Sequence, residues 1–163
     1  MTEPEKLTAA EGKVRGYDPA TVCQLQAAEI ARSEARALIP EIESAFDGVP
    51  RPRITLSVAR GYDDEWNLSE ERVAELNALD PEQTWQEVPD QAIEGSQEYF
   101  TFSDPCGWLF YLPAFMCHCL RKFPDRGWEA VRLACERRTH FDLLGVDQLR
   151  CVDRFLHLCS RHD

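Results

Sequence analysis

The residues best suited to chemistry lie in a Cys-His-Cys tripeptide, Cys117 to Cys119, near the end of the most apolar run of the chain. Thiolate and imidazole groups are common zinc ligands in proteins. On a helix, however, residues two apart point about 200° from one another, so both thiols cannot face one ion. No Cys-x-x-Cys pair occurs in the sequence. We therefore expect no metal and no cofactor, and we interpret these cysteines as buried apolar residues.

Nucleophilic catalysis would need a thiol or hydroxyl beside a base. Cys135 with His140, or Cys106 with His118, could form such a pair only if the fold brought the two side chains together. The sequence contains no Gly-x-Ser-x-Gly, no glycine-rich phosphate loop and no His-Glu-x-x-His. It therefore assigns no catalytic residue and favours a non-enzymatic role over an enzymatic one.

The net charge of −11 is concentrated in one quarter of the chain. Residues 61–100 contain twelve acidic residues and one basic residue, Arg72, which gives −11, while the acids and bases on either side cancel. An acidic surface repels phosphate backbones, so we expect no nucleic-acid binding and consider a basic protein partner. The alternative is that the acidic residues form a solvated surface that only promotes solubility.

Aromatic residues are interleaved with these acids, and this combination can anchor a protein interface. The alternative for Trp85 is a core position in its own short helix. The residues that we predict to contact a partner are Asp63, Asp64, Glu65, Trp66, Glu70, Glu71 and Trp85.

The apolar run Gly107 to Leu120 could be a membrane segment or the core of a small domain. A membrane-spanning helix needs roughly 20 apolar residues, and this run is shorter and contains His118. We therefore predict no membrane span but a buried central helix near residues 108–123, which begins at Pro113 or bends there. If the protein is instead a small enzyme or ligand-binding domain, its pocket should lie beside Tyr111, Pro113 and His118.

Apolar residues recur at helical spacing through most of the chain. The predicted helices are 19–46, bent or divided at Pro40, then 69–79, 80–88, and one within each of the segments 124–138 and 145–162. Ile54 to Val58 could be a strand or a short helix capped by Thr55, and we favour the helix because no second strand-like run could pair with it. The sequence thus predicts an all-α, irregular, compact helical domain of about six to seven helices.

Residues 1–18 are polar and predict a loosely ordered N-terminus, whereas residues 19–163 fit a single helical domain. The seven cysteines follow no disulfide framework spacing, and the N-terminal residues lack the apolar stretch of a secretory signal. These two features predict a reduced, cytoplasmic protein.

Several segments together resemble a family of small bacterial proteins of unknown function. The resemblance covers roughly residues 40–160, and its most specific part is the Tyr-Leu-Pro-Ala-Phe-Met sequence from Tyr111 to Met116. The other matching positions are Ala45-Phe46, Trp85 to Val88, Phe102 to Pro105, and Gln148 with Phe155-Leu156. The resemblance implies a bacterial cytosolic protein and supplies no activity, cofactor or catalytic residue. The concentration of net charge in residues 61–100, with aromatic residues interleaved, leads us to expect an immunity-like or antitoxin-like interaction module.

Overall fold

The computed structural model describes residues 6–163, and within them the chain is helical with no strand. Nine α-helices and two short 3₁₀ helices follow one another in this range. Their bounds are α1 Ala9–Val14, α2 Pro19–Ala45, α3 Leu56–Glu65, α4 Glu70–Ala78, η1 Trp85–Glu87, α5 Asp90–Glu94, α6 Tyr99–Phe102, α7 Pro105–Lys122, α8 Ala130–Arg137, η2 Phe141–Leu143 and α9 Val146–Arg161. The predicted all-α class is confirmed. The described residues contain more helices than the six to seven predicted, because short ones such as α1, α5 and α6 are included.

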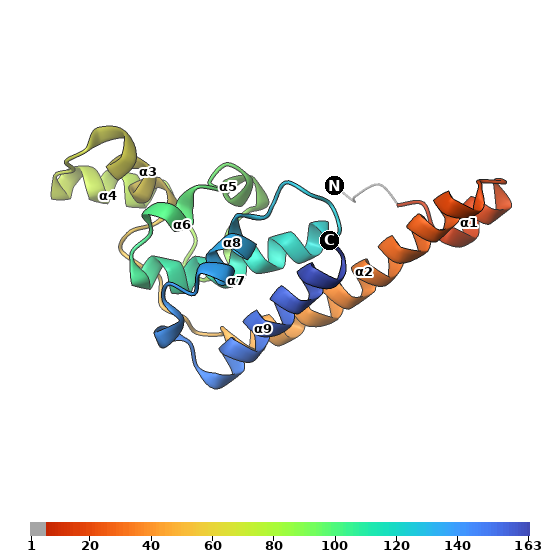
Figure 1. Ribbon diagram of the computed structural model, residues 1–163. Helices are drawn as coiled ribbons and strands as arrows, with labels where there is room; N and C mark the ends of the chain where they lie inside the picture. Colours follow the sequence, from red (N-terminus) through yellow and green to blue (C-terminus); the bar gives the residue numbers. More distant parts are fainter. Residues whose placement is uncertain (1–5) are drawn as a thin grey trace.

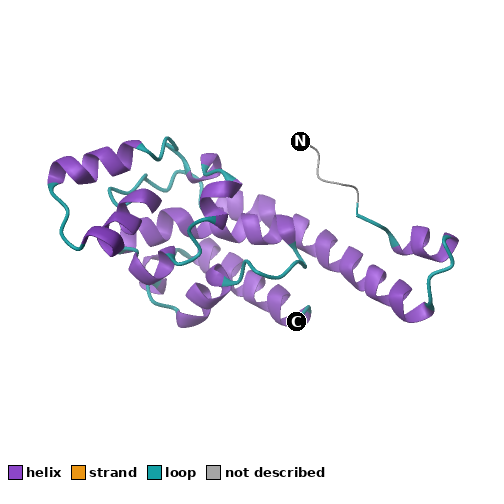
Figure 2. Cartoon of the chain, turned by 90° about the horizontal axis from the view of Figure 1, so that it is seen from above, coloured by secondary structure: helices purple, strands orange, loops and turns teal. Residues whose placement is uncertain are grey.

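The long helix α2 is the spine of the fold, and α7 and α9 pack along its C-terminal half (Figure 1). Its N-terminal half projects from this body and carries α1, while the α3 and α4 pair lies at the opposite end of the molecule (Figures 1 and 2). The molecule is therefore elongated, with its main apolar core where α2, α7 and α9 meet.

Helix α7 is the central helix that the apolar run predicts. Asp104 caps it, because its Oδ1 accepts the backbone N–H of Gly107 at 3.0 Å, and Pro105 follows at the first helical position. The side chains of Phe115, Met116 and Leu120 are at most 1% exposed. Their predicted burial is confirmed, and no helix in the described part of the chain is long and apolar enough to cross a membrane.

The two internal prolines do not interrupt their helices. Helix α7 starts eight residues before Pro113 and runs through it, and α2 continues past Pro40 to Ala45. A start at Pro113 and a division at Pro40 were therefore wrong. An interior proline costs about 3 kcal/mol. Burial of α7 on most faces around Pro113 offsets that cost, and on α2 the exposed Pro40 lies between the buried Leu38 and Ile42.

The predicted loose N-terminus is in part a helix. Residues 1–5 lie outside the described range, but α1 begins with a capping box in which Thr8 and Glu11 satisfy each other's backbone N–H groups. Gly12 is buried against α2, where an added Cβ would lie only 2.8 Å from Leu25 Cδ1. Glycine at this position lets α1 pack closely on α2.

Candidate functional site

Helices α3 and α4 form a small hairpin, residues 56–78, that we call the α3–α4 tip (Figure 1). The tip has its own apolar cluster of Val58, Val73 and Leu76, separate from the main core. Gly61 permits this packing, because a Cβ there would collide with Leu76 Cδ1. Because α3 begins at Leu56, the predicted helix rather than strand at 54–58 is confirmed, with Thr55 at the N-cap position.

Arg51 fastens the end of the tip to the chain that follows it. Its Nε donates to the carbonyl oxygen of Glu82 at 2.7 Å, and its Nη2 donates to the carbonyl of Asp80 at 2.6 Å. Asn77, at the end of α4, accepts two further hydrogen bonds from the same guanidinium. One partly buried arginine therefore holds the C-terminal end of α4 in place.

Asp80 caps the N-terminus of α3 from outside that helix. The backbone N–H and the hydroxyl of Ser57 donate to its carboxylate at 2.9 and 2.7 Å. Thr55, the N-cap residue, makes no capping bond, and its buried hydroxyl has no hydrogen-bond partner. A carboxylate at the positive end of α3 supplies the stabilisation that a local cap usually gives.

Glu82 joins this loop to the central helix. It is buried, and its Oε1 accepts a 2.9 Å hydrogen bond from the hydroxyl of Tyr111. Burial, followed by the charge of Glu82, raises the pKa of Tyr111 well above its ordinary value, so the hydroxyl stays protonated and remains a donor. The sequence does not identify this contact, because nothing in the residues near Glu82 points to a partner in α7.

The turn between α3 and α4 is strained at Trp66. Its backbone has φ 57° and ψ −56°, and the N–H of Asn67 bonds to the carbonyl of Glu65 at 2.5 Å across it. This is a γ-turn with positive φ, which is rare and unfavourable for a residue with a bulky side chain. The Trp66 side chain is 91% exposed and so gains almost no burial.

Acidic residues flank Trp66 on both sides along the chain, and three of them lie at the unfavourable end of a helix dipole. Asp63, Asp64 and Glu65 occupy the last turn of α3, where the negative end of the helix disfavours anions. Glu70 and Glu71 occupy the first turn of α4, where anions are stabilising. The hydrogen bonds that Arg72 donates to Glu65 and then to Glu75 raise the pKa of its guanidinium.

Six of the seven predicted contact residues are exposed on this tip: Asp63, Asp64, Glu65, Trp66, Glu70 and Glu71. The seventh, Trp85, is a correction. Its ring is 3% exposed in the main core, and its Nε1 donates to the carbonyl of Phe46 at 2.9 Å. The predicted helix over 80–88 is also shorter than expected, since only Trp85–Glu87 form a 3₁₀ turn.

The three predicted pocket residues lie inside packed protein. Tyr111 and Pro113 are buried in α7, and the His118 side chain is 1% exposed. His118 Nε2 lies 3.0 Å from Glu94 Oε1, with the edge-on Trp128 ring 5.1 Å away. Tyr111 and His118 therefore bind different carboxylates and do not line a common pocket.

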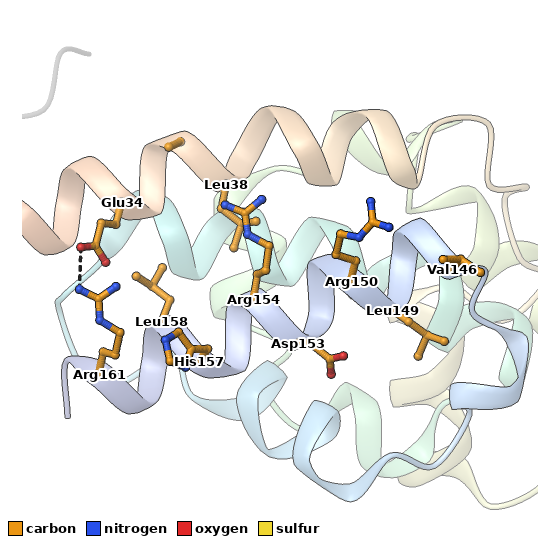
Figure 3. A pocket seen from close by; sticks show the side chains of 11 residues that line it. Glu34, Leu38, Val146, Leu149, Arg150, Asp153, Arg154, His157, Leu158 and Arg161 are labelled. Atoms are coloured by element: carbon orange, nitrogen blue, oxygen red, sulfur yellow. Dashed lines mark hydrogen bonds and ion pairs between the residues drawn. The ribbon is translucent and has the colours of Figure 1, made fainter.

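An open groove of about 810 Å³ runs between α2 and α9 (Figure 3). Its floor is apolar, with Leu38 from α2 and Leu149 and Leu158 from α9. Of the arginines on its rim, Arg161 pairs with Glu34 of α2 at 2.9 Å, and Arg154 pairs with a second α2 carboxylate. These cross-helix pairs hold α2 against α9 and leave little net positive charge for a ligand.

Helix α7 directs the Cys-His-Cys side chains to different neighbours. His118 lies beside Glu94 of α5. Cys117 lies near Cys151 of α9, and Cys119 lies near Cys159 of the same helix. Among residues 6–163 no group of three or more His, Cys, Asp or Glu is arranged to hold a metal ion.

Residues 34–158 match the family described as "Family of unknown function (DUF6714)". No curated protein and no solved structure matches the chain. The resemblance to a family of unknown function is therefore confirmed, while the bacterial origin and the specific motif stay predictions. The match covers both the α3–α4 tip and most of the groove.

Proposed function

Since the chain belongs to DUF6714, a family of unknown function, we propose its role from its geometry: it is a non-enzymatic protein-interaction module whose α3–α4 tip binds a basic protein segment. The observation that carries this proposal is Trp66, which is strained and 91% exposed among carboxylates. Strained backbone and exposed aromatic side chains cost stability and are characteristic of functional positions. An immunity-like or antitoxin-like role in the cytoplasm is the form of the proposal that we favour.

Charge and shape both support this choice of partner. No cation in the described chain forms an ion pair with Asp63, Asp64, Glu70 or Glu71 within 4.0 Å, so these carboxylates are available to another molecule. An exposed tryptophan provides a large, rigid contact surface, and arginine stacks well on such a ring. A partner rich in arginine would therefore satisfy the ring and the carboxylates together.

The rest of the fold supports the tip as a rigid platform. Arg51, Asp80 and Glu82 tie both ends of the hairpin to the core. A preorganised surface loses less conformational entropy on binding than a flexible loop. The projection of the tip from the body leaves it open to a partner (Figure 1).

The test is a titration with an arginine-rich peptide, followed by tryptophan fluorescence. Trp85 and Trp108 are buried and Trp128 is partly buried, so the change in emission that is absent from a Trp66→Gly variant reports on Trp66. We expect binding at low salt that is lost at about 0.5 M salt, because a Debye length of about 4 Å screens exposed charges. A peptide of equal length with glutamine in place of arginine should not bind.

Matched charge variants locate the binding surface. Asp63→Asn with Asp64→Asn removes two tip charges and should weaken binding about fivefold, at about 0.5 kcal/mol per exposed pair. Asp142→Asn with Asp153→Asn removes the same net charge from exposed positions outside the tip and should leave the affinity unchanged. Equal affinities for both double variants would show that the tip is not the binding surface.

A further inference from the structure

Three helices bring cysteines together at one end of the core. Cys119 of α7, Cys135 of α8 and Cys159 of α9 are all buried, and all seven cysteines of the chain are free thiols. Cys119 and Cys159 line the same small cavity, so their thiols lie near one another although the two residues are forty positions apart in sequence. Proximity of the two sulfurs is the first requirement for a disulfide.

A small cavity of about 60 Å³ lies against this pair and is lined by both cysteines. A water molecule occupies about 30 Å³ in the liquid, so the cavity has room for a molecule the size of hydrogen peroxide. Arg132 also lines it and is held in place by bidentate bonds of 2.6 and 2.8 Å to Asp163. The cavity therefore combines two thiols with a fixed Arg132–Asp163 ion pair.

The two thiols differ in acidity, as nucleophile and resolving thiol must. The hydrogen bond from Cys119 lowers the pKa of Cys159, and Arg132 lowers it further against the opposing effect of burial. The same hydrogen bond and burial raise the pKa of Cys119. Burial is the main cause of the raised pKa of Cys135. Cys159 is thus the thiol most easily ionised in this cluster.

We propose that Cys159 and Cys119 are a peroxide-sensitive redox pair that closes to a disulfide linking α9 to α7. The Cys159 thiolate attacks one oxygen of a hydroperoxide, the O–O bond breaks, and the Cys159 sulfur becomes a sulfenic acid as the alcohol or water leaves. The Cys119 thiol then attacks that sulfur and water departs, taking the thiol proton. Two thiols are oxidised, and one hydroperoxide is reduced.

Mass spectrometry of the folded wild-type protein tests this proposal. The protein is treated with one equivalent of hydrogen peroxide, its free thiols are alkylated after unfolding, and fragment ions assign the bridged cysteines. We expect a Cys119–Cys159 disulfide in most molecules, with the exposed Cys23 and Cys106 still alkylated. Oxidation of Cys23 and Cys106 with Cys119 and Cys159 both reduced would overturn the proposal, as would a Cys117–Cys151 or Cys135–Cys159 bridge.

A variant separates the two chemical steps. Cys119→Ala removes the resolving thiol, so the sulfenic acid at Cys159 should persist and be labelled by dimedone at Cys159 several-fold more than in the wild type. Equal labelling of Cys159 in both proteins would contradict the order of the steps. If Cys119→Ala fails to fold, the wild-type disulfide assignment alone decides the outcome.

Discussion

The hydroxyl of Tyr111 donates a 2.9 Å hydrogen bond to Glu82 Oε1, and both side chains are buried. Tyr111 belongs to the central helix α7, whereas Glu82 follows the α3–α4 tip along the chain. The same hydroxyl lies 3.4 Å from the backbone N–H of Leu56 at the start of α3. One phenol therefore connects the core to both ends of the proposed interaction surface.

Removing that hydroxyl should destabilise the whole fold. In Tyr111→Phe the carboxylate of Glu82 loses a donor in a buried site, and such a loss costs about 1–3 kcal/mol. The free energy of unfolding from urea denaturation measures the effect. Tyr62→Phe makes the same chemical change at an exposed tyrosine and should alter stability by less than about 0.5 kcal/mol. Equal stabilities for the two variants would show that the Tyr111–Glu82 bond contributes nothing.

The core role of α7 predicts a larger effect at Phe115. Its ring is 1% exposed and lies 4.8 Å from the Phe100 ring, centroid to centroid. Phe115→Ala should therefore cost about 3–5 kcal/mol of unfolding free energy. Phe102, which is 48% exposed, provides the matched control, and Phe102→Ala should cost much less. Thermal melts compare the two, and similar midpoints would contradict the central position of Phe115.

Helical periodicity and apolar composition were sufficient to predict the fold class and the buried face of α7. On α9 the apolar spacing of Leu149, Val152, Leu156 and Cys159, with Phe155 beside them, indicates the face that packs on the core. Val152, Phe155 and Cys159 are buried there, and Leu149 and Leu156 are partly buried. The exposed position of Trp66 follows from the polar residues around it. These features are local, because each depends on residues within a few turns of one helix.

The features that the sequence could not reveal depend on distant partners. Glu82 and Trp85 look like members of one short helix, yet their side chains bond to Tyr111 and to the carbonyl of Phe46. The continuity of α7 through Pro113 depends on packing that outweighs a local penalty. The shared cavity of Cys119 and Cys159 has no sequence signature, since spacing along the chain does not determine which helices meet.

The contact between α2 and α9 should weaken in acid. Hydrogen bonding with His162 lowers the pKa of Glu34 below its ordinary value of 4.5, and Arg161 adds to this against the effect of burial. Ionised Glu34 thus stabilises the fold above about pH 4.5, and this contribution is lost as the pH falls through the lowered pKa. Glu34→Gln should melt below the wild type at pH 7, with a difference that shrinks as the pH falls below 4.5. A difference independent of pH would contradict this account.

Trp66 should be unfavourable for stability. Replacing it with glycine relieves a positive-φ strain of about 1–3 kcal/mol but adds up to about 1 kcal/mol of entropy to the unfolded chain. We therefore expect Trp66→Gly to be as stable as the wild type or up to about 2 kcal/mol more stable in urea denaturation. Trp66→Ala keeps a Cβ at the strained position and should be about 1 kcal/mol less stable than the glycine variant. A glycine variant clearly less stable than both would indicate a structural role for the ring.

The central claim is that the α3–α4 tip binds a basic protein, and quantitative capture from a lysate of the source organism tests it most directly. Wild type, Trp66→Gly and Leu133→Ala, a change at an exposed apolar residue of α8, are compared at low and high salt. We predict a basic protein that wild type and Leu133→Ala retain at low salt, that high salt releases, and that Trp66→Gly captures at least tenfold less. Equal capture by all three proteins, or no salt-sensitive partner for the wild type, would contradict the claim.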